Sequence, residues 1–270
     1  MQTRSEDVSA GADAALDQAL ARAVLYQALG ASLRRPQAEE RQRLFSPAGR
    51  HALGGAAAEL DADPSPVEPL RPLVEEWAAR GAGGREPSRE DHDRLFGHSR
   101  GLVCAFETEY GPEGGFEQPQ ALADIAGSYR AFGLEIRGGQ DERVDHAACE
   151  CEFLSFLARK EVYTLGVGPL ASELEVVRSA ERGFLREHLG RFGRAFASRL
   201  LQEDPAGFFG ATGAVLFAFL AWDCRRFGVT PGLPVLKLRP PNLDDAPLAC
   251  GSAGGCGIPR EPIPAPRQRP

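Results

Sequence analysis

The sequence predicts an all-α protein, a single bundle of about eight to ten helices. Apolar residues recur at helical spacing along successive segments, whereas no run of alternating apolar and polar residues marks a strand. Hydrophobic residues make up 43% and charged residues 26% of the 270 residues, which is ordinary for a globular protein with a sizeable core. We therefore expect one helical domain over residues 15–230.

Each predicted helix follows from an apolar stripe and from the residues that start or stop it. Pro36 ends the first helix, and Ser88 with Asp91 is typical of a helix start. Pro119 suits a first helical turn, and Ser172 with Glu175 has the spacing of a capping box. The predicted helices lie at 15–34, within 37–60, and at 67–79, 88–96, 119–133, 142–157, 172–189, 190–202 and 206–227.

The two ends of the chain differ from the middle. Residues 1–14 are polar and acidic without the apolar core of a signal peptide, so we expect a flexible N-terminus. Residues 231–270 are rich in proline and glycine and lack an apolar period, which predicts a largely disordered C-terminal tail. The proline-rich stretch 64–72 predicts a linker between helices.

Charge and composition exclude several classes of protein. A formal net charge of −7 disfavours binding to nucleic acid or to anionic lipid and suits a cationic partner. No apolar run is long enough to span a bilayer, so we expect no stable membrane association. The six cysteines come without a secretory context, which indicates reduced thiols and a cytoplasmic location.

Residues 142–157 are the stretch around which the chain is organised. At helical spacing, His146, Glu150 and Phe153 share one stripe, and the C-terminal half of the stretch is apolar. We expect Glu142 and Asp145 in the first turn, where the helix dipole favours negative charge. This pattern predicts a helix that anchors its end in the core and offers its beginning as an anionic surface.

Asp145-His146, preceded by Tyr-Arg-Ala-Phe-Gly-Leu-Glu at 129–135, resembles the TorD/DmsD/NarJ family of molybdoenzyme maturation chaperones, and most of all the branch that serves type II enzymes of the dimethyl sulfoxide reductase family. Four further segments agree with this resemblance, at 106–111, 121–127, 186–191 and 223–229. The resemblance implies a cytoplasmic chaperone that is not an enzyme and holds no cofactor. Its partners would be the apo catalytic subunit of a molybdopterin oxidoreductase and any twin-arginine leader, with cofactor insertion assisted and export delayed.

The same resemblance implies a client-binding site. Asp145 and His146 would bind the leader peptide, with Glu142 and Glu109 as further acids beside them. The apolar part of the leader would meet an aromatic groove formed by Tyr110, Phe116 and Tyr129. The alternative is that Asp145 only caps a helix, that His146 is a hydrogen-bonded surface residue, and that the aromatic residues pack in the core.

A cysteine-based metal or redox protein is the rival interpretation. It would use Cys149 and Cys151 beside His146, together with Cys250 and Cys256 in a glycine-rich loop. Side chains two positions apart on a helix diverge by about 200°, so Cys149 and Cys151 do not predict a closed metal site. No GxSxG motif or other nucleophile arrangement occurs, so we expect no catalytic residues.

Overall fold

The computed structural model describes residues 2–63, 68–83, 88–97, 101–111, 117–135, 143–167 and 170–239. The all-α prediction is confirmed, because this part of the chain contains ten α-helices and no strand. The elements are α1 (Gln2–Leu33), α2 (Ala38–Leu44), α3 (Pro47–Asp61), α4 (Leu70–Ala82), α5 (Arg89–Phe96), the 3-10 turn η1 (Glu107–Glu109), α6 (Glu117–Ala131), α7 (Ala147–Gly166), α8 (Ala171–Glu187), α9 (Leu189–Glu203) and α10 (Phe208–Arg226). Several expectations fall outside the described residues, namely those for Phe116, Glu142, Cys250, Cys256 and the tail from residue 240.

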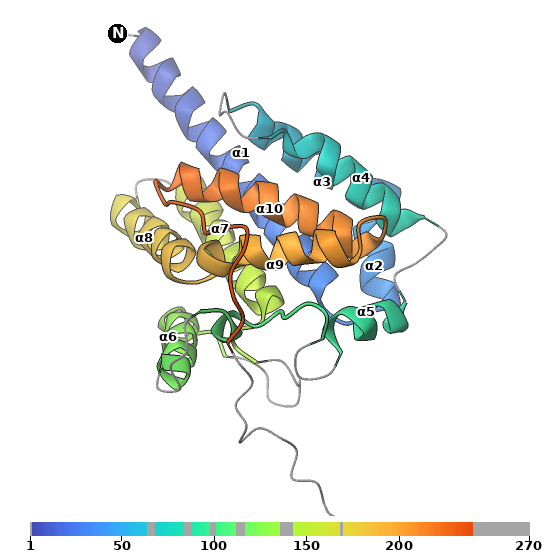
Figure 1. The fold of residues 1–270 in the computed structure, drawn as a ribbon. Coiled ribbons are helices and arrows are strands. Elements are labelled where there is room, and N and C mark those ends of the chain that lie inside the picture. Colours follow the sequence, from blue (N-terminus) through green and yellow to red (C-terminus); the bar gives the residue numbers. More distant parts are fainter. Residues whose placement is uncertain are drawn as a thin grey trace, which may run out of the picture. The chain divides into compact units, whose positions relative to one another are not determined.

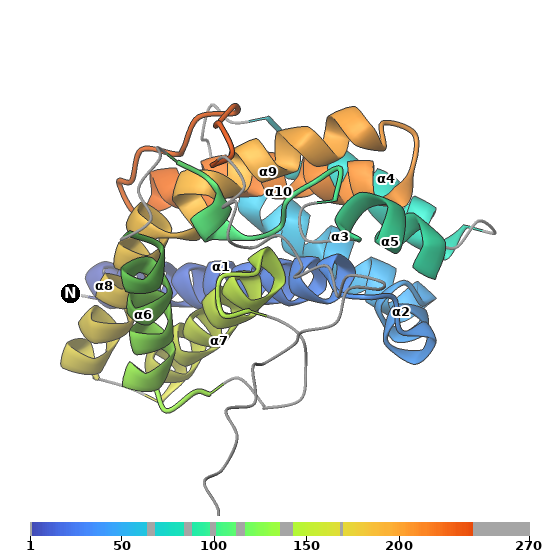
Figure 2. The same cartoon turned by 60° about the horizontal axis from the view of Figure 1, so that its bottom comes forward.

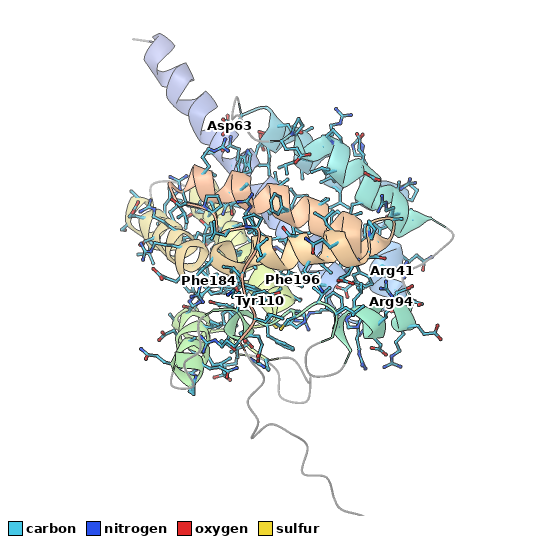
Figure 3. All side chains as sticks on the ribbon, in the orientation of Figure 1. Arg41, Asp63, Arg94, Tyr110, Phe184 and Phe196 are labelled. Atoms are coloured by element: carbon cyan, nitrogen blue, oxygen red, sulfur yellow. The ribbon has the colours of Figure 1, made fainter. Side chains whose placement is uncertain are left out.

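The helices pack around α1 and α10. Helix α1 lies along α7 and α3, and α10 lies along α9 and α4 (Figures 1 and 2). Helix α8 joins the two groups by packing against α7 and α9. Large apolar side chains such as Phe184 and Phe196 fill the space between these helices (Figure 3).

Two glycines let α9 and α10 approach each other closely. A Cβ atom at Gly193 would lie 2.6 Å from Leu220 Cδ1, and one at Gly213 would lie 2.7 Å from the carbonyl oxygen of Ala197. Among the described helices, α10 alone is long and apolar enough to cross a membrane. Its most apolar window is 78% buried inside the bundle, as is also the case for the core helix of a soluble protein.

Some predicted boundaries are wrong. Helix α1 begins at Gln2 and not near residue 15, and the flexibility expected of residues 1–14 stays a prediction. The single helix expected within 37–60 is two, because Ser46 accepts a hydrogen bond from Gly49 N and starts α3 anew. Helix α8 begins at Ala171, and Ser172 bonds the side chain of Glu173 instead of forming a capping box.

Residues 231–239, which we expected to belong to the tail, are hydrogen-bonded to the bundle. We call them the C-terminal strap. The amide of Gly232 donates to the carbonyl of Gly190 at 2.8 Å, and the amide of Arg239 donates to the carbonyl of Glu109 at 2.8 Å. The strap therefore ties the segment around η1 to the start of α9.

A buried arginine joins four helices. Arg22 of α1 is fully buried, and its Nε donates to Asp223 Oδ1 of α10 at 2.6 Å. Its Nη1 donates to Glu161 Oε2 of α7 at 2.7 Å, and its Nη2 donates to Glu181 Oε1 of α8 at 2.8 Å. The hydroxyl of Tyr26 donates to Asp223 Oδ2 at 2.7 Å.

The charges of this network balance. Arg178 and Arg226 approach the second carboxylate oxygen of Glu161 at 2.7 and 3.0 Å, so three arginines face three acids. Burial opposes the ionisation of Glu161, but the three arginines hold its pKa below the usual range. Burial raises the pKa of Glu181 to about 7, against the attraction of Arg22. With all three acids ionised the network is neutral. Asp223 and Glu181 share Arg22 as their cation, whereas Glu161 also contacts Arg178 and Arg226.

Replacing Arg22 by methionine should destabilise the bundle by about 3–5 kcal/mol, because three buried carboxylates lose a shared cation. Urea unfolding followed by circular dichroism measures this change. The matched control is Arg35→Met, at an exposed ion pair with Asp93, which should cost less than about 0.5 kcal/mol. A loss below about 1 kcal/mol for Arg22→Met would show that the network is not a main support of the fold.

Candidate functional site

Asp145 lies in the short segment that enters α7, held against the residues before η1. The amide of Glu107 donates to the carbonyl of Asp145 at 2.9 Å, and the amide of Ala147 donates to the carbonyl of Ala105 at 2.8 Å. Phe106 and His146 form an isolated antiparallel bridge between these two bonds. Two segments distant in sequence are thereby fixed side by side.

The expected position of Asp145 in the first turn of its helix is wrong. Helix α7 begins at Ala147, and His146 is its cap, because His146 Nδ1 accepts a hydrogen bond from Ala148 N at 3.1 Å. Asp145 is fully buried and caps η1 instead. Its Oδ2 accepts from Thr108 N at 3.1 Å and from Thr108 Oγ1 at 2.7 Å.

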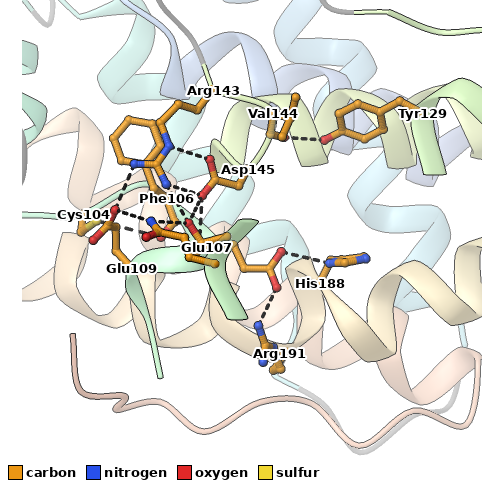
Figure 4. A network of polar contacts seen from close by, with 12 residues as sticks. Cys104, Phe106, Glu107, Glu109, Tyr129, Arg143, Val144, Asp145, His188 and Arg191 are labelled. Carbon is orange, nitrogen blue, oxygen red and sulfur yellow. Dashed lines mark hydrogen bonds and ion pairs between the residues drawn. The ribbon is translucent and has the colours of Figure 1, made fainter. Parts of the chain in front are cut away.

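The carboxylate of Asp145 also holds the guanidinium of Arg143 (Figure 4). Arg143 Nε donates to Asp145 Oδ1 at 3.0 Å, and Nη2 donates to Asp145 Oδ2 at 2.9 Å and to Thr108 Oγ1 at 2.7 Å. Nη1 donates to Glu109 Oε1 at 3.0 Å, and the group lies 4.5 Å from the centroid of the Phe106 ring. We call Phe106, Thr108, Glu109 and Asp145 the guanidinium cradle.

Behind the two acids of the cradle lies a third, Glu107, which sequence reasoning did not single out. Glu107 is buried, and its carboxylate meets His188 Nδ1 at 3.1 Å and Arg191 Nη2 at 2.7 Å (Figure 4). Glu150 is fully buried, and burial together with the charges of Glu107 and Asp145 raises its pKa well above the usual range. The acids near the beginning of α7 are thus largely enclosed. In the sequence, the only signal for this is that Glu107 and Glu109 lie two residues apart, so that their side chains point in different directions.

Two of the three aromatic residues that we grouped in one groove, Tyr110 and Tyr129, are buried in different surroundings, and the third, Phe116, lies outside the described residues. Tyr129 is buried beside Phe153, and its hydroxyl donates to the carbonyl of Val144 at 2.9 Å, so it supports the cradle from the core. Tyr110 is also buried but lines a surface cavity of about 370 Å³. Leu236 and Leu238 of the strap line the same cavity. Because Glu109 and Tyr110 are consecutive, the cradle and this cavity flank one segment.

The cysteine interpretation finds no support in the described residues. Cys104, Cys149, Cys151 and Cys224 are buried, and no group of three or more potential metal ligands occurs in the described part of the chain. Burial raises the pKa of Cys149 to about 11 and that of Cys151 well above the usual range. Both thiols are therefore protonated at neutral pH and act as small core residues.

The environment of His146 opposes its protonation. Burial, together with the positive charge of Arg34, lowers the pKa of His146 to about 4 against the attraction of Asp145. The neutral ring accepts a hydrogen bond at Nδ1, so the proton lies on Nε2. The imidazole of His146 is therefore neutral at neutral pH in the free protein.

His146 should make stability fall in acid. Its folded-state pKa lies below the ordinary 6.5, so the unfolded chain binds the proton more tightly between about pH 6.5 and 4. Stability that is present above this window is lost as the pH falls through it, by about 1–2 kcal/mol between pH 7 and 5. Asparagine also caps helices, so His146→Asn should lose less over the same interval in urea unfolding. Equal losses in the two proteins would contradict this account.

Residues 60–198, slightly more than half of the chain, match the family described as nitrate reductase delta subunit. The match includes η1, the cradle and α7, whereas Arg22 and α10 lie outside it. No curated protein matches the chain at a significant level. The all-helical fold and the family match agree with the resemblance seen in the sequence. The chain therefore belongs to the nitrate reductase delta subunit family, whose members are maturation chaperones that act on molybdoenzyme catalytic subunits.

Proposed function

We propose that this protein is a cytoplasmic chaperone for the apo catalytic subunit of a molybdopterin oxidoreductase. Its client would belong to the type II enzymes of the dimethyl sulfoxide reductase family. The chaperone holds the subunit until the molybdenum cofactor is inserted and delays export where the subunit carries a twin-arginine leader. It does so by binding and not by catalysis. Membership of the family supports the general role, and the guanidinium cradle is the observation that supports leader binding.

The cradle matches the chemistry of an arginine side chain. Guanidinium is planar and binds carboxylates through paired hydrogen bonds, and Asp145 offers both of its oxygens in this way. Glu109 and Thr108 add two acceptors, and the ring of Phe106 adds a face for stacking. The net charge of −7 favours the approach of a cationic segment.

The apolar part of a leader would bind on the other side of the same segment. Twin-arginine leaders follow their arginines with an apolar stretch, and the cavity beside Tyr110 is lined by leucines of the strap. Leu102 and Leu238 at this cavity are both more than two-fifths exposed, which leaves apolar surface for a partner to cover. We therefore propose that the leader crosses from the cradle to this cavity.

Capture from the native host tests the chaperone role. The tagged protein is expressed at low level, and the proteins retained with it are identified by mass spectrometry. We expect a molybdopterin oxidoreductase catalytic subunit that lacks cofactor. Recovery of the cofactor-loaded subunit in the same yield as the apo subunit would contradict the proposal.

Asp145→Asn tests the site with a leader peptide synthesised from the captured subunit, in a protein that carries Arg143→Gln so that no internal guanidinium competes for the carboxylate. Loss of a charge-assisted contact should weaken binding by about 1.5–3 kcal/mol, or roughly one to two decades of affinity. The difference should shrink as salt rises, because an ion pair near the surface is screened. Isothermal titration at low and high salt measures both effects.

Asp93→Asn is the matched control, because it makes the same change in an exposed pair with Arg35 outside the cradle. Glu109→Gln is a second test that leaves the cap of η1 intact. Circular dichroism and thermal melting show whether each variant is folded. If folded Asp145→Asn and Glu109→Gln both bind the peptide as tightly as the parent Arg143→Gln protein at low salt, the cradle is only structural.

A further inference from the structure

We propose that Arg143 is an internal latch: it fills the guanidinium cradle as a pseudo-ligand, and an arginine from the client enters only by displacing it. The inference rests on the proposed function, in which the arginine comes from the leader peptide of the client. It adds a step to binding, because Arg143 occupies the acids of the cradle that the leader would need.

The first step of the argument is that the cradle is full. Both oxygens of Asp145 accept from Arg143, and the Glu109 carboxylate receives its Nη1. The ring of Phe106 is covered by the same guanidinium. A second guanidinium would find these acceptors engaged and would meet a like charge at contact distance. An external arginine therefore competes with Arg143 and does not bind beside it.

The second step is that Arg143 can leave the cradle while Asp145 and Glu109 keep their positions. The side chain of Arg143 is 37% exposed, whereas those of Asp145 and Glu109 are 0% and 12% exposed. Asp145 keeps two hydrogen bonds from Thr108 when Arg143 departs, and Gln118 Nε2 reaches Glu109 Oε1 at 3.2 Å. The acids are thus held by the fold, and only the cation is at the surface.

The third step concerns which cation replaces it. An open cradle leaves a buried carboxylate without compensation, so the open form binds a cation strongly. The paired oxygens of Asp145 and the facing ring of Phe106 favour a planar fork over an ammonium group. The apparent affinity for an external arginine is the affinity of the open form multiplied by the fraction of molecules in that form. If this fraction is about 1–10%, the latch weakens binding about ten- to a hundredfold.

Arg143→Gln tests the latch by titration with two peptides. One is the twin-arginine leader peptide, and the other is identical except that both arginines are lysines. We expect the variant to bind the arginine peptide at least about tenfold more tightly than the wild type, with a much smaller gain for the lysine peptide. Arg191→Gln is the matched control, because it removes a half-exposed arginine from the neighbouring acid Glu107.

Methylguanidinium provides a readout that needs no leader. Loss of Arg143 leaves Asp145 uncompensated, so Arg143→Gln should melt at a lower temperature than the wild type. Methylguanidinium at concentrations below its denaturing range should raise the melting temperature of Arg143→Gln and not that of the wild type or Arg191→Gln. Arg143→Lys keeps a charge in the cradle and serves as the folded alternative where Arg143→Gln is too unstable for titration.

The outcomes separate the latch from the proposed function. If the wild type and the Arg143 variants bind the arginine peptide equally, the latch is overturned and leader binding stands. If no protein binds the peptide but methylguanidinium stabilises Arg143→Gln selectively, leader binding fails and the latch on a guanidinium site stands. If neither probe distinguishes Arg143→Gln from Arg191→Gln, the latch is overturned.

Discussion

The guanidinium of Arg22 holds carboxylates from α7, α8 and α10 inside the bundle, and α1 carries it there. The apolar side chains packed between these helices fix their proximity better than their register. Arg22 bonds three acids at 2.6–2.8 Å, and Tyr26 bonds one of these acids. These directional contacts fix the register of the four helices relative to one another. The entrance to α7 is consequently held in place for the cradle at its N-terminal end.

The protein contains two arginines in similar chemical surroundings but with different exposure. Arg22 is fully buried, and every group that it meets belongs to the core. Arg143 has comparable partners, yet more than a third of its side chain is exposed at the edge of the bundle. Arg22 stays in place, because its departure would leave three buried carboxylates without their shared cation. The site of Arg143 is open to exchange with solvent and with other cations.

The helical fold could be predicted from periodicity because most helices bury one stripe of apolar residues. The start of α5 was also predictable, since the capping of Ser88 and Asp91 is local in sequence. The cradle was not, because Thr108, Glu109 and Phe106 come from the segment around η1, far from Asp145 in the chain. Periodicity assigned Asp145 to its own helix, whereas tertiary hydrogen bonds turned it towards Thr108. Arg22 was missed for the same reason: its acids lie in three other helices.

Arginine Nε–H signals in nuclear magnetic resonance spectra test directly whether one guanidinium is fixed and the other exchanges. The labelled protein is titrated with the leader peptide until binding is saturated. The account predicts that the Arg22 signal keeps its position and its slow exchange with solvent, while the Arg143 signal moves to the position of a solvated arginine. An Arg143 signal that stays unchanged in the saturated complex would contradict the account.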